Sequence, residues 1–214
     1  MTCRVSRSAL AVAIASITIA SAAVAQMKVE VGASIGLYSP TGTFEPAPVH
    51  STNLPRGPEQ LSGSAIGAEL RLWVAPRVGV QFTGTTTSSN VGGGSTPEGE
   101  APTTSARVST GSAQLLFRVT GDASRARIWL GAGRGVIQHG GSTYAPFGNP
   151  VNYGTVASIG SAIRIRGDLS ADLGVSSMIY NLDIRGTAAT DPNLSERGRQ
   201  VDLLMHTGLS YSWH

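Results

Sequence analysis

His139 and His206 are the histidines to consider for nucleophilic catalysis, because one precedes a serine and the other follows an acid on the same predicted strand. Such catalysis needs a hydroxyl, a histidine base and a carboxylate within hydrogen-bonding reach. His139 precedes Ser142 by three positions, and Asp202 precedes His206 by four. Side chains alternate between the two faces of an extended strand, so residues three apart point to opposite faces. We therefore predict no catalytic pair of His139 and Ser142, and no catalytic residues.

A glycine run, Gly131-x-Gly133-x-Gly135, could suggest a nucleotide-binding loop. Such a loop has the spacing GxGxxG and opens a helix, whereas this run lies within an alternating apolar segment that no helix follows. Glycines at alternate strand positions make room for large side chains such as Trp129. No metal-ligand cluster accompanies them, so the sequence predicts neither a cofactor nor a metal.

Charged residues recur opposite apolar ones in most of the alternating segments. Acids and bases in comparable numbers on one face could line an ion pathway, or they could neutralise one another. Burial of unpaired charges is costly, which favours the neutralising arrangement. The predicted charge network comprises Lys28, Glu30, Glu69, Arg71, Arg118, Arg127, Arg164, Arg166, Asp172 and Asp202.

Eight segments with period-two alternation must position these side chains. This period is typical of strands with two unlike faces, and the abundance of glycine, 27 residues, fits an all-β protein better than a helical one. The predicted strands are 28–38, 64–73, 78–86, 107–119, 125–138, 153–166, 169–180 and about 200 to the end.

The connections between these strands alternate between long and short. Long loops are predicted at 39–63, 87–105, 139–152 and 181–199, and tight turns between them at 74–77, 120–124 and 167–168. This rhythm is typical of an antiparallel up-and-down barrel with both termini on the short-turn side. Strands of about ten residues, tilted by about 40°, match the roughly 25 Å apolar band of a membrane barrel.

The first 25 residues have the features of a secretory signal peptide. Arg4 and Arg7 precede an apolar stretch at 9–20, and small residues at 23 and 25 form a cleavage site. The only cysteine, Cys3, lies in this segment, so the predicted mature barrel, 26–214, has no thiol. Removal of Arg4 and Arg7 leaves 14 basic against 13 acidic residues, which does not suggest a nucleic-acid partner.

The whole of residues 27–214 resembles the small eight-stranded outer-membrane β-barrels, the group of the outer membrane protein A membrane domain, OmpX and OmpW. The resemblance rests on the alternation, on RIWLGAGRGVIQ at 127–138 and on the ending LSYSWH. It implies a polar lumen, an apolar lipid-facing surface, periplasmic termini and extracellular loops. It also implies that the outer-membrane assembly machinery reads the terminal strand, with Leu209, Tyr211 and Trp213 as the insertion signal and His214 as a departure from it.

Arg107 and Arg134 break the apolar outward face of two neighbouring strands. By parity they face lipid and lie within a few residues of each other across the ladder. One interpretation is a strand end or bulge where parity fails. The other is a pair that binds phosphate groups of lipopolysaccharide at the outer interface.

Three functions remain open for a membrane barrel of this kind. The preferred one is a non-enzymatic structural or adhesin-like protein that meets an unknown extracellular partner through its four long loops. A small-solute channel of the OmpW type is the alternative, and a lipid A-modifying enzyme ranks below it because such deacylases carry His-x-Ser whereas this chain has His139-Gly-Gly-Ser142. A soluble barrel, with its apolar face inside, is the remaining alternative.

Overall fold

The computed structural model describes residues 27–41, 59–92, 95–96, 99–100, 104–121, 124–142, 144–145, 149–185 and 195–213. The predicted signal peptide, His214 and parts of the four long loops lie outside these residues. The cleavage prediction therefore stays a prediction. Within the described ranges no helix is long and apolar enough to cross a membrane.

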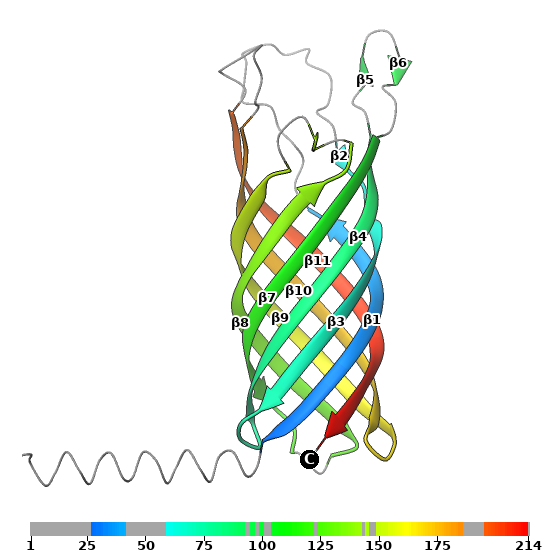
Figure 1. Cartoon of the computed structure of the whole chain (residues 1–214), viewed down its shortest axis with the longest axis vertical. Coiled ribbons are helices and arrows are strands. Elements are labelled where there is room, and N and C mark those ends of the chain that lie inside the picture. Colours follow the sequence, from blue (N-terminus) through cyan, green and yellow to red (C-terminus); the bar gives the residue numbers. More distant parts are fainter. Residues whose placement is uncertain are drawn as a thin grey trace, which may run out of the picture.

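Eight long antiparallel strands form a closed barrel, which confirms the predicted fold class (Figure 1). Consecutive long strands pair with each other, and the barrel closes where the first strand pairs with the last. The long strands are β1 (Lys28–Pro40), β3 (Gly63–Trp73), β4 (Val78–Gly92), β7 (Thr104–Arg118), β8 (Ala126–Gly140), β9 (Val151–Arg166), β10 (Leu169–Arg185) and β11 (Ser195–Trp213), and the short ones are β2 (Glu59–Gln60), β5 (Ser95–Thr96) and β6 (Gly99–Glu100).

Several strands extend further toward the long loops than the sequence predicts. β4 reaches Gly92 instead of residue 86, β10 reaches Arg185 instead of 180, and β11 begins at Ser195 instead of 200. In β4 the extension is rich in Ser and Thr, so it lacks the apolar alternation that marks a strand. Its backbone groups nevertheless pair with β7 as far as Val91, because a partner strand of matching length is present.

The two faces of the barrel wall have opposite chemistry. Side chains on the outer face are apolar and exposed, including Ile35 at 65 %, Leu115 at 63 % and Leu173 at 62 %. Side chains on the inner face include Arg71 and Arg118, which are 0 and 1 % exposed. A soluble barrel would bury the apolar face, so this inverted arrangement is that of a membrane barrel and excludes the soluble alternative.

The terminal strand closes the barrel by pairing with almost the whole length of β1. Val29 lies opposite Trp213, and the pairing with β1 continues without a shift to Pro40 and Asp202. The rings of Tyr211 and Trp213 contact each other edge to face, with centroids 4.8 Å apart, on the exposed outer surface. The strict alternation near the C-terminus therefore has a structural cause, since an unpaired edge would be costly in hydrocarbon.

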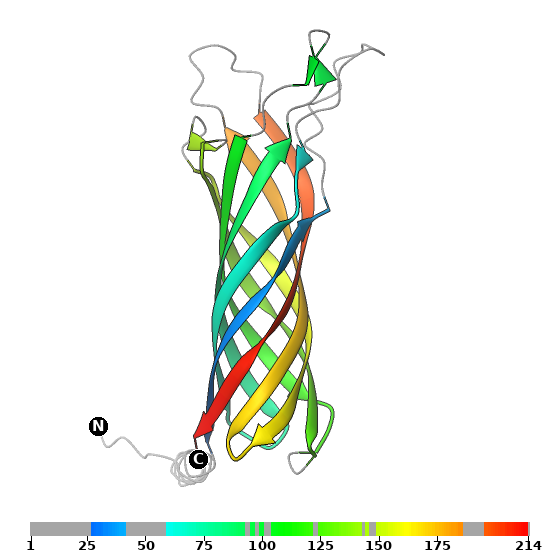
Figure 2. The ribbon, with the colours of Figure 1, turned by 90° about the vertical axis from the view of Figure 1, so that its right-hand side faces the viewer.

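The two ends of the barrel differ. The tight turns and the last strand's end lie at one end, called the lower end, and the longer connections lie at the other (Figure 2). In the turn between β9 and β10, Gly167 has a φ of 55°, in the left-handed region that glycine adopts without steric cost. The alternation of long and short connections follows the prediction.

Glycine at position 160 provides space for a lumen tryptophan. A Cβ atom at Gly160 would lie 2.6 Å from two ring atoms of Trp129, whereas a Cβ at Gly84 would meet nothing within 4 Å. We expect Gly160→Ala to lower the free energy of unfolding by about 1–3 kcal/mol, because the buried ring must shift. Urea unfolding in lipid vesicles, followed by tryptophan fluorescence, measures this change.

Gly84→Ala is the matched control, since it adds the same methyl group to an open position of another strand. It is expected to be neutral or to stabilise the barrel by up to about 1 kcal/mol. Equal destabilisation by the two substitutions would contradict the assignment of Gly160 as a packing position.

Candidate functional site

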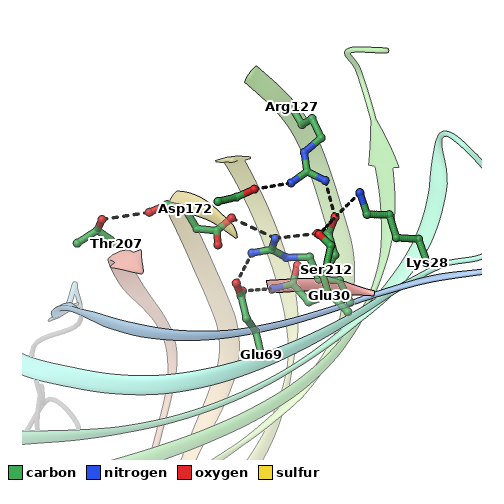
Figure 3. Close-up of polar contacts among 10 residues, drawn as sticks. Lys28, Glu30, Glu69, Arg127, Asp172, Thr207 and Ser212 are labelled. Carbon is green, nitrogen blue, oxygen red and sulfur yellow. Dashed lines mark hydrogen bonds and ion pairs between the residues drawn. The ribbon is translucent and has the colours of Figure 1, made fainter. Parts of the chain in front are cut away.

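Arg71 of β3 lies at the centre of a buried charge cluster in the lower lumen. Figure 3 shows its partners Glu30, Glu69 and Asp172. Its Nη1 lies 3.3 Å from Glu30 Oε2 and 3.2 Å from Asp172 Oδ1, and its Nη2 pairs with Glu69. One guanidinium therefore connects carboxylates from β1, β3 and β10. A guanidinium suits this position because its N–H groups point in several fixed directions in one plane.

Two further cations complete the cluster. Arg127 Nη1 lies 2.5 Å from Glu30 Oε1, and Arg127 Nη2 donates to Ser170 Oγ at 2.9 Å. Lys28 Nζ lies 3.5 Å from Glu30 Oε1. Glu30 thus meets three cations, and contacts from several strands converge on it across the lumen.

The cluster is electrically balanced. Three carboxylates face three cations, so their formal charges cancel without help from water or a bound ion. Paired, hydrogen-bonded charges of this kind are tolerated in a narrow interior, whereas an unpaired one is costly. We call this group the lower charge cluster; its members are Lys28, Glu30, Glu69, Arg71, Arg127 and Asp172.

Two tryptophans pack against the arginines of the lower lumen. The Arg71 guanidinium lies 4.2 Å from the centroid of the Trp129 ring, and that of Arg118 lies 3.8 Å from the Trp73 ring. Arg118 Nη1 also donates to the carbonyl of Pro76 at 3.2 Å. Arg118 is thus a lumen residue as predicted, but it stacks on an aromatic ring and caps a turn rather than joining the lower charge cluster.

Above this cluster the lumen contains a small cavity of about 60 Å³ whose lining combines hydroxyl and amide side chains with apolar ones. Facing strands pair their hydroxyls here, with Thr83 and Ser112 2.6 Å apart and Thr85 and Thr110 2.5 Å apart. The cavity has room for a few water molecules. It does not form an open passage, because the lower charge cluster bounds it on one side.

A second buried group, the upper cluster, bounds the cavity on the other side. The hydroxyls of Tyr38 and Tyr180 donate to Asp202 Oδ2 at 2.6 and 3.0 Å. His139 Nε2 lies 3.3 Å from the Tyr180 hydroxyl, and its ring centroid lies 4.9 Å from that of Tyr144. Burial, with a smaller contribution from Asp202, raises the pKa of Tyr144, which lies beyond the end of β8.

Asp202 was predicted to join the other lumen charges, and the structure separates it from them. It belongs to the upper cluster, where two hydroxyl donors solvate its carboxylate. The sequence analysis did not identify this cluster. The alternation could have indicated it, since Tyr38 and Tyr180 occupy inward-facing positions of β1 and β10.

The predicted lumen positions of Arg164 and Arg166 are wrong. Both side chains are exposed at the lower end of β9, where the pairing with β10 shifts register between Leu169 and Ser170. Arg164 keeps inward parity opposite the buried Ser170, whereas Arg166 lies past the register shift, opposite Leu169. Among the described residues, neither arginine forms an ion pair with the lower charge cluster.

Arg107 and Arg134 are both exposed on the outer surface, but they do not form a pair. Arg134 lies opposite Ala113, whereas Arg107 lies opposite Gly140, six residues further along β8. That separation is about 20 Å at roughly 3.3 Å per residue. The predicted proximity is therefore wrong because of the hairpin register, and Arg134 instead donates to Thr155 Oγ1 at 3.2 Å.

The residues considered for catalysis do not meet. His139 points into the lumen and is 1 % exposed, whereas Ser142 is exposed and shares a hydrogen bond with Ser105 at 3.0 Å. In the described parts of the chain no group of three or more His, Cys, Asp or Glu residues could hold a metal ion.

Known structures share this architecture. OprG from Pseudomonas aeruginosa superimposes with a TM-score of 0.63 at 13 % identity, covering 87 % of this chain and 96 % of that one. The outer membrane protein AlkL, determined in lipid bilayers, gives a TM-score of 0.56 at 15 % identity, covering 86 % of this chain and 90 % of its own. No protein-family model and no curated protein matches the sequence.

These comparisons establish the class of the fold. The chain has the architecture of the small eight-stranded outer-membrane β-barrels, the group that its sequence resembles. OprG and AlkL are named outer membrane proteins, and the apolar outer wall described above is what such a location requires.

Arg71→Met tests the central position of Arg71. The substitution keeps most of the side-chain volume but leaves buried carboxylates without their shared cation. We expect a loss of about 3–5 kcal/mol in the free energy of unfolding, measured in urea with the protein in lipid vesicles.

Arg107→Met, at an exposed arginine, is the control and is expected to change the free energy by no more than about 0.5 kcal/mol. Addition of Asp172→Asn to Arg71→Met should recover part of the loss, because it removes one of the unneutralised acids. Equal effects of the Arg71 and Arg107 substitutions would contradict the central position of Arg71.

Proposed function

We propose that this protein is a non-enzymatic, non-conducting barrel of the outer membrane that acts as a structural and surface-interaction protein through its long loops. Its termini and tight turns face the periplasm, and the long loops face outward. The observation that carries the proposal is the charge-filled lower lumen, which favours action through the barrel's surfaces over transport.

The lower charge cluster supports the absence of conduction. Its side chains reach across the lumen from β1, β3, β8 and β10, and Arg71, Glu30 and Arg127 are each no more than 2 % exposed. The upper cluster is a second barrier above the small cavity. An ion would have to separate several buried ion pairs to pass, which is energetically unfavourable.

The upper ends of the strands support a role for the loops. β4 and β10 continue beyond the alternating apolar region, to Gly92 and Arg185, and β11 begins ahead of that region, at Ser195. Loops on a rigid scaffold are the usual location of recognition. The extracellular partner is met through the loops at 39–63, 87–105, 139–152 and 181–199.

Two further interactions belong to this proposal. The exposed side chains of Leu209, Tyr211 and Trp213 on β11 serve as the insertion signal for the outer-membrane assembly machinery. Arg107 and Arg134 each contact lipopolysaccharide phosphates as separate sites, because they are too far apart to hold one group.

Planar bilayer recording tests the closed lumen. We expect no steady conductance from the unmodified protein. Tyr38→Ala combined with Tyr180→Ala removes most of the upper barrier, and we expect this variant also to be silent, because the lower charge cluster still spans the lumen. A steady conductance of the unmodified protein would favour a small-solute channel of the OmpW type instead.

Shortening of residues 93–103 to a tight turn tests the role of the loops. We expect the barrel to assemble, since this segment lies beyond the pairing of β4 with β7, and we expect cells that display it to attach less well to surfaces. Arg77→Gln, in a tight turn at the opposite end, is the control. Unchanged attachment after shortening of each long loop in turn would contradict the adhesin-like role.

A further inference from the structure

Three arginines gather at the lower end of the barrel. Arg125 immediately precedes β8, and Arg164 and Arg166 lie at the end of β9; all three are exposed. The backbone N–H of Arg164 donates to the carbonyl of Arg125 at 3.1 Å, so the two residues are direct cross-strand neighbours. Arg166 follows two positions later, past the register shift, and pairs with Leu169 at the end of the ladder. We call these three residues the arginine rim.

The pairing register places like charges opposite each other. Ala126 lies opposite Ile163, and the ladder continues to Arg125 and Arg164, whose side chains therefore project from the same face. Like charges directly opposite on a sheet repel each other and destabilise the pair. An anion between the two guanidinium groups would turn this repulsion into attraction.

The ion pairs of the described residues do not include the rim. In the part of the chain that the structure describes, none of these three guanidinium groups forms an ion pair. The nearest lumen acids are already occupied, since the lower charge cluster contains as many cations as carboxylates. Arg127, the next inward residue on β8, illustrates the contrast because it turns inward and pairs with Glu30 at 2.5 Å.

The local charge balance is positive. Arg77 in the turn before β4 adds a fourth exposed arginine to this end of the barrel. The acids in these turns are Asp168 and Asp122, the latter outside the described residues. Bases therefore outnumber acids at the end where the barrel meets one bilayer surface (Figure 2).

From this arrangement we propose that the arginine rim is a binding site for a phosphate group at the lower mouth of the barrel. Guanidinium groups bind phosphate oxygens through paired, charge-assisted hydrogen bonds, and two or three of them can surround one tetrahedral group. The phosphate can belong to the headgroup of an anionic phospholipid in the adjacent leaflet or to a soluble phosphate ester.

The position of the arginine rim makes it accessible both to lipid headgroups and to soluble phosphate esters. Ile163 and Ile165, which alternate with the arginines on β9, are exposed on the lipid-facing side at 51 and 56 %. The rim thus lies at the edge of the apolar surface, at the level of lipid headgroups. Its arginine side chains are also exposed to water at the lower mouth of the barrel. Basic residues at this level attract anionic lipids.

The test compares the full-length mature barrel with a variant carrying Arg125→Gln, Arg164→Gln and Arg166→Gln. In the first arm, inorganic phosphate and glycerol phosphate are titrated into protein in a neutral detergent, and binding is followed by the NMR shifts of the arginine Nε groups. In the second arm, nanodiscs contain equal amounts of phosphatidylglycerol and phosphatidylcholine, and native mass spectrometry measures which lipid is retained.

We expect saturable binding of phosphate or enrichment of phosphatidylglycerol, with a loss of about fivefold in affinity for each arginine removed. Binding of soluble phosphate without lipid enrichment identifies a phosphate ester as the ligand. Enrichment of phosphatidylglycerol identifies the lipid headgroup.

The matched control is Arg199→Gln, at an exposed arginine outside the rim, and it is compared with the single rim substitution Arg164→Gln. It loses the same charge, so a general electrostatic effect would weaken both variants equally. The proposal is overturned if neither ligand binds, if the rim variant binds as well as the unmodified protein, or if the control variant loses as much affinity as the rim variant. Heat-modifiable gel migration checks that both variants are folded.

Discussion

Burial of charge in a narrow lumen is the constraint on which the rest of this structure depends. A barrel of eight strands encloses little space, and its inner face must be polar because its outer face is apolar. Charged groups in that space are stable only when every one has a partner. Arg71 satisfies this condition by joining Glu30, Glu69 and Asp172, and Arg127 and Lys28 neutralise the remaining charge.

The lower charge cluster does not include every arginine of the lower barrel. Arg118 lies outside the cluster, where it stacks on Trp73 and caps a turn, and Arg164 and Arg166 are exposed at the mouth. A passage for solutes through the lower lumen would require these ion pairs to open. The same contacts connect β1, β3, β8 and β10, and among the described residues none of them reaches the arginine rim.

The upper cluster also contains a buried carboxylate, but hydrogen bonds rather than ion pairs stabilise it. Asp202 is 4 % exposed and has no cation near enough to pair with among the described residues, and the hydroxyls of Tyr38 and Tyr180 solvate it instead. Between the two clusters, hydroxyl pairs such as Thr83 with Ser112 satisfy each other across strands. The lumen thus changes from ion pairs to neutral hydrogen bonds to a solvated carboxylate along its axis.

The sequence by itself determined the number of long strands, their alternation, the rhythm of turns and loops and the inward parity of the charges. These properties are local, because a period of two and the presence of Gly, Pro or Ser in connections are visible within ten residues. Tertiary structure decided which residues of like parity meet. Arg71 and Arg164 both have inward parity, yet only Arg71 lies where the lumen still exists, and Arg107 and Arg134 are separated by the register of β7 and β8. The stagger of neighbouring strands and the height of each residue arise only when the barrel closes, so a single strand's pattern contains no record of them.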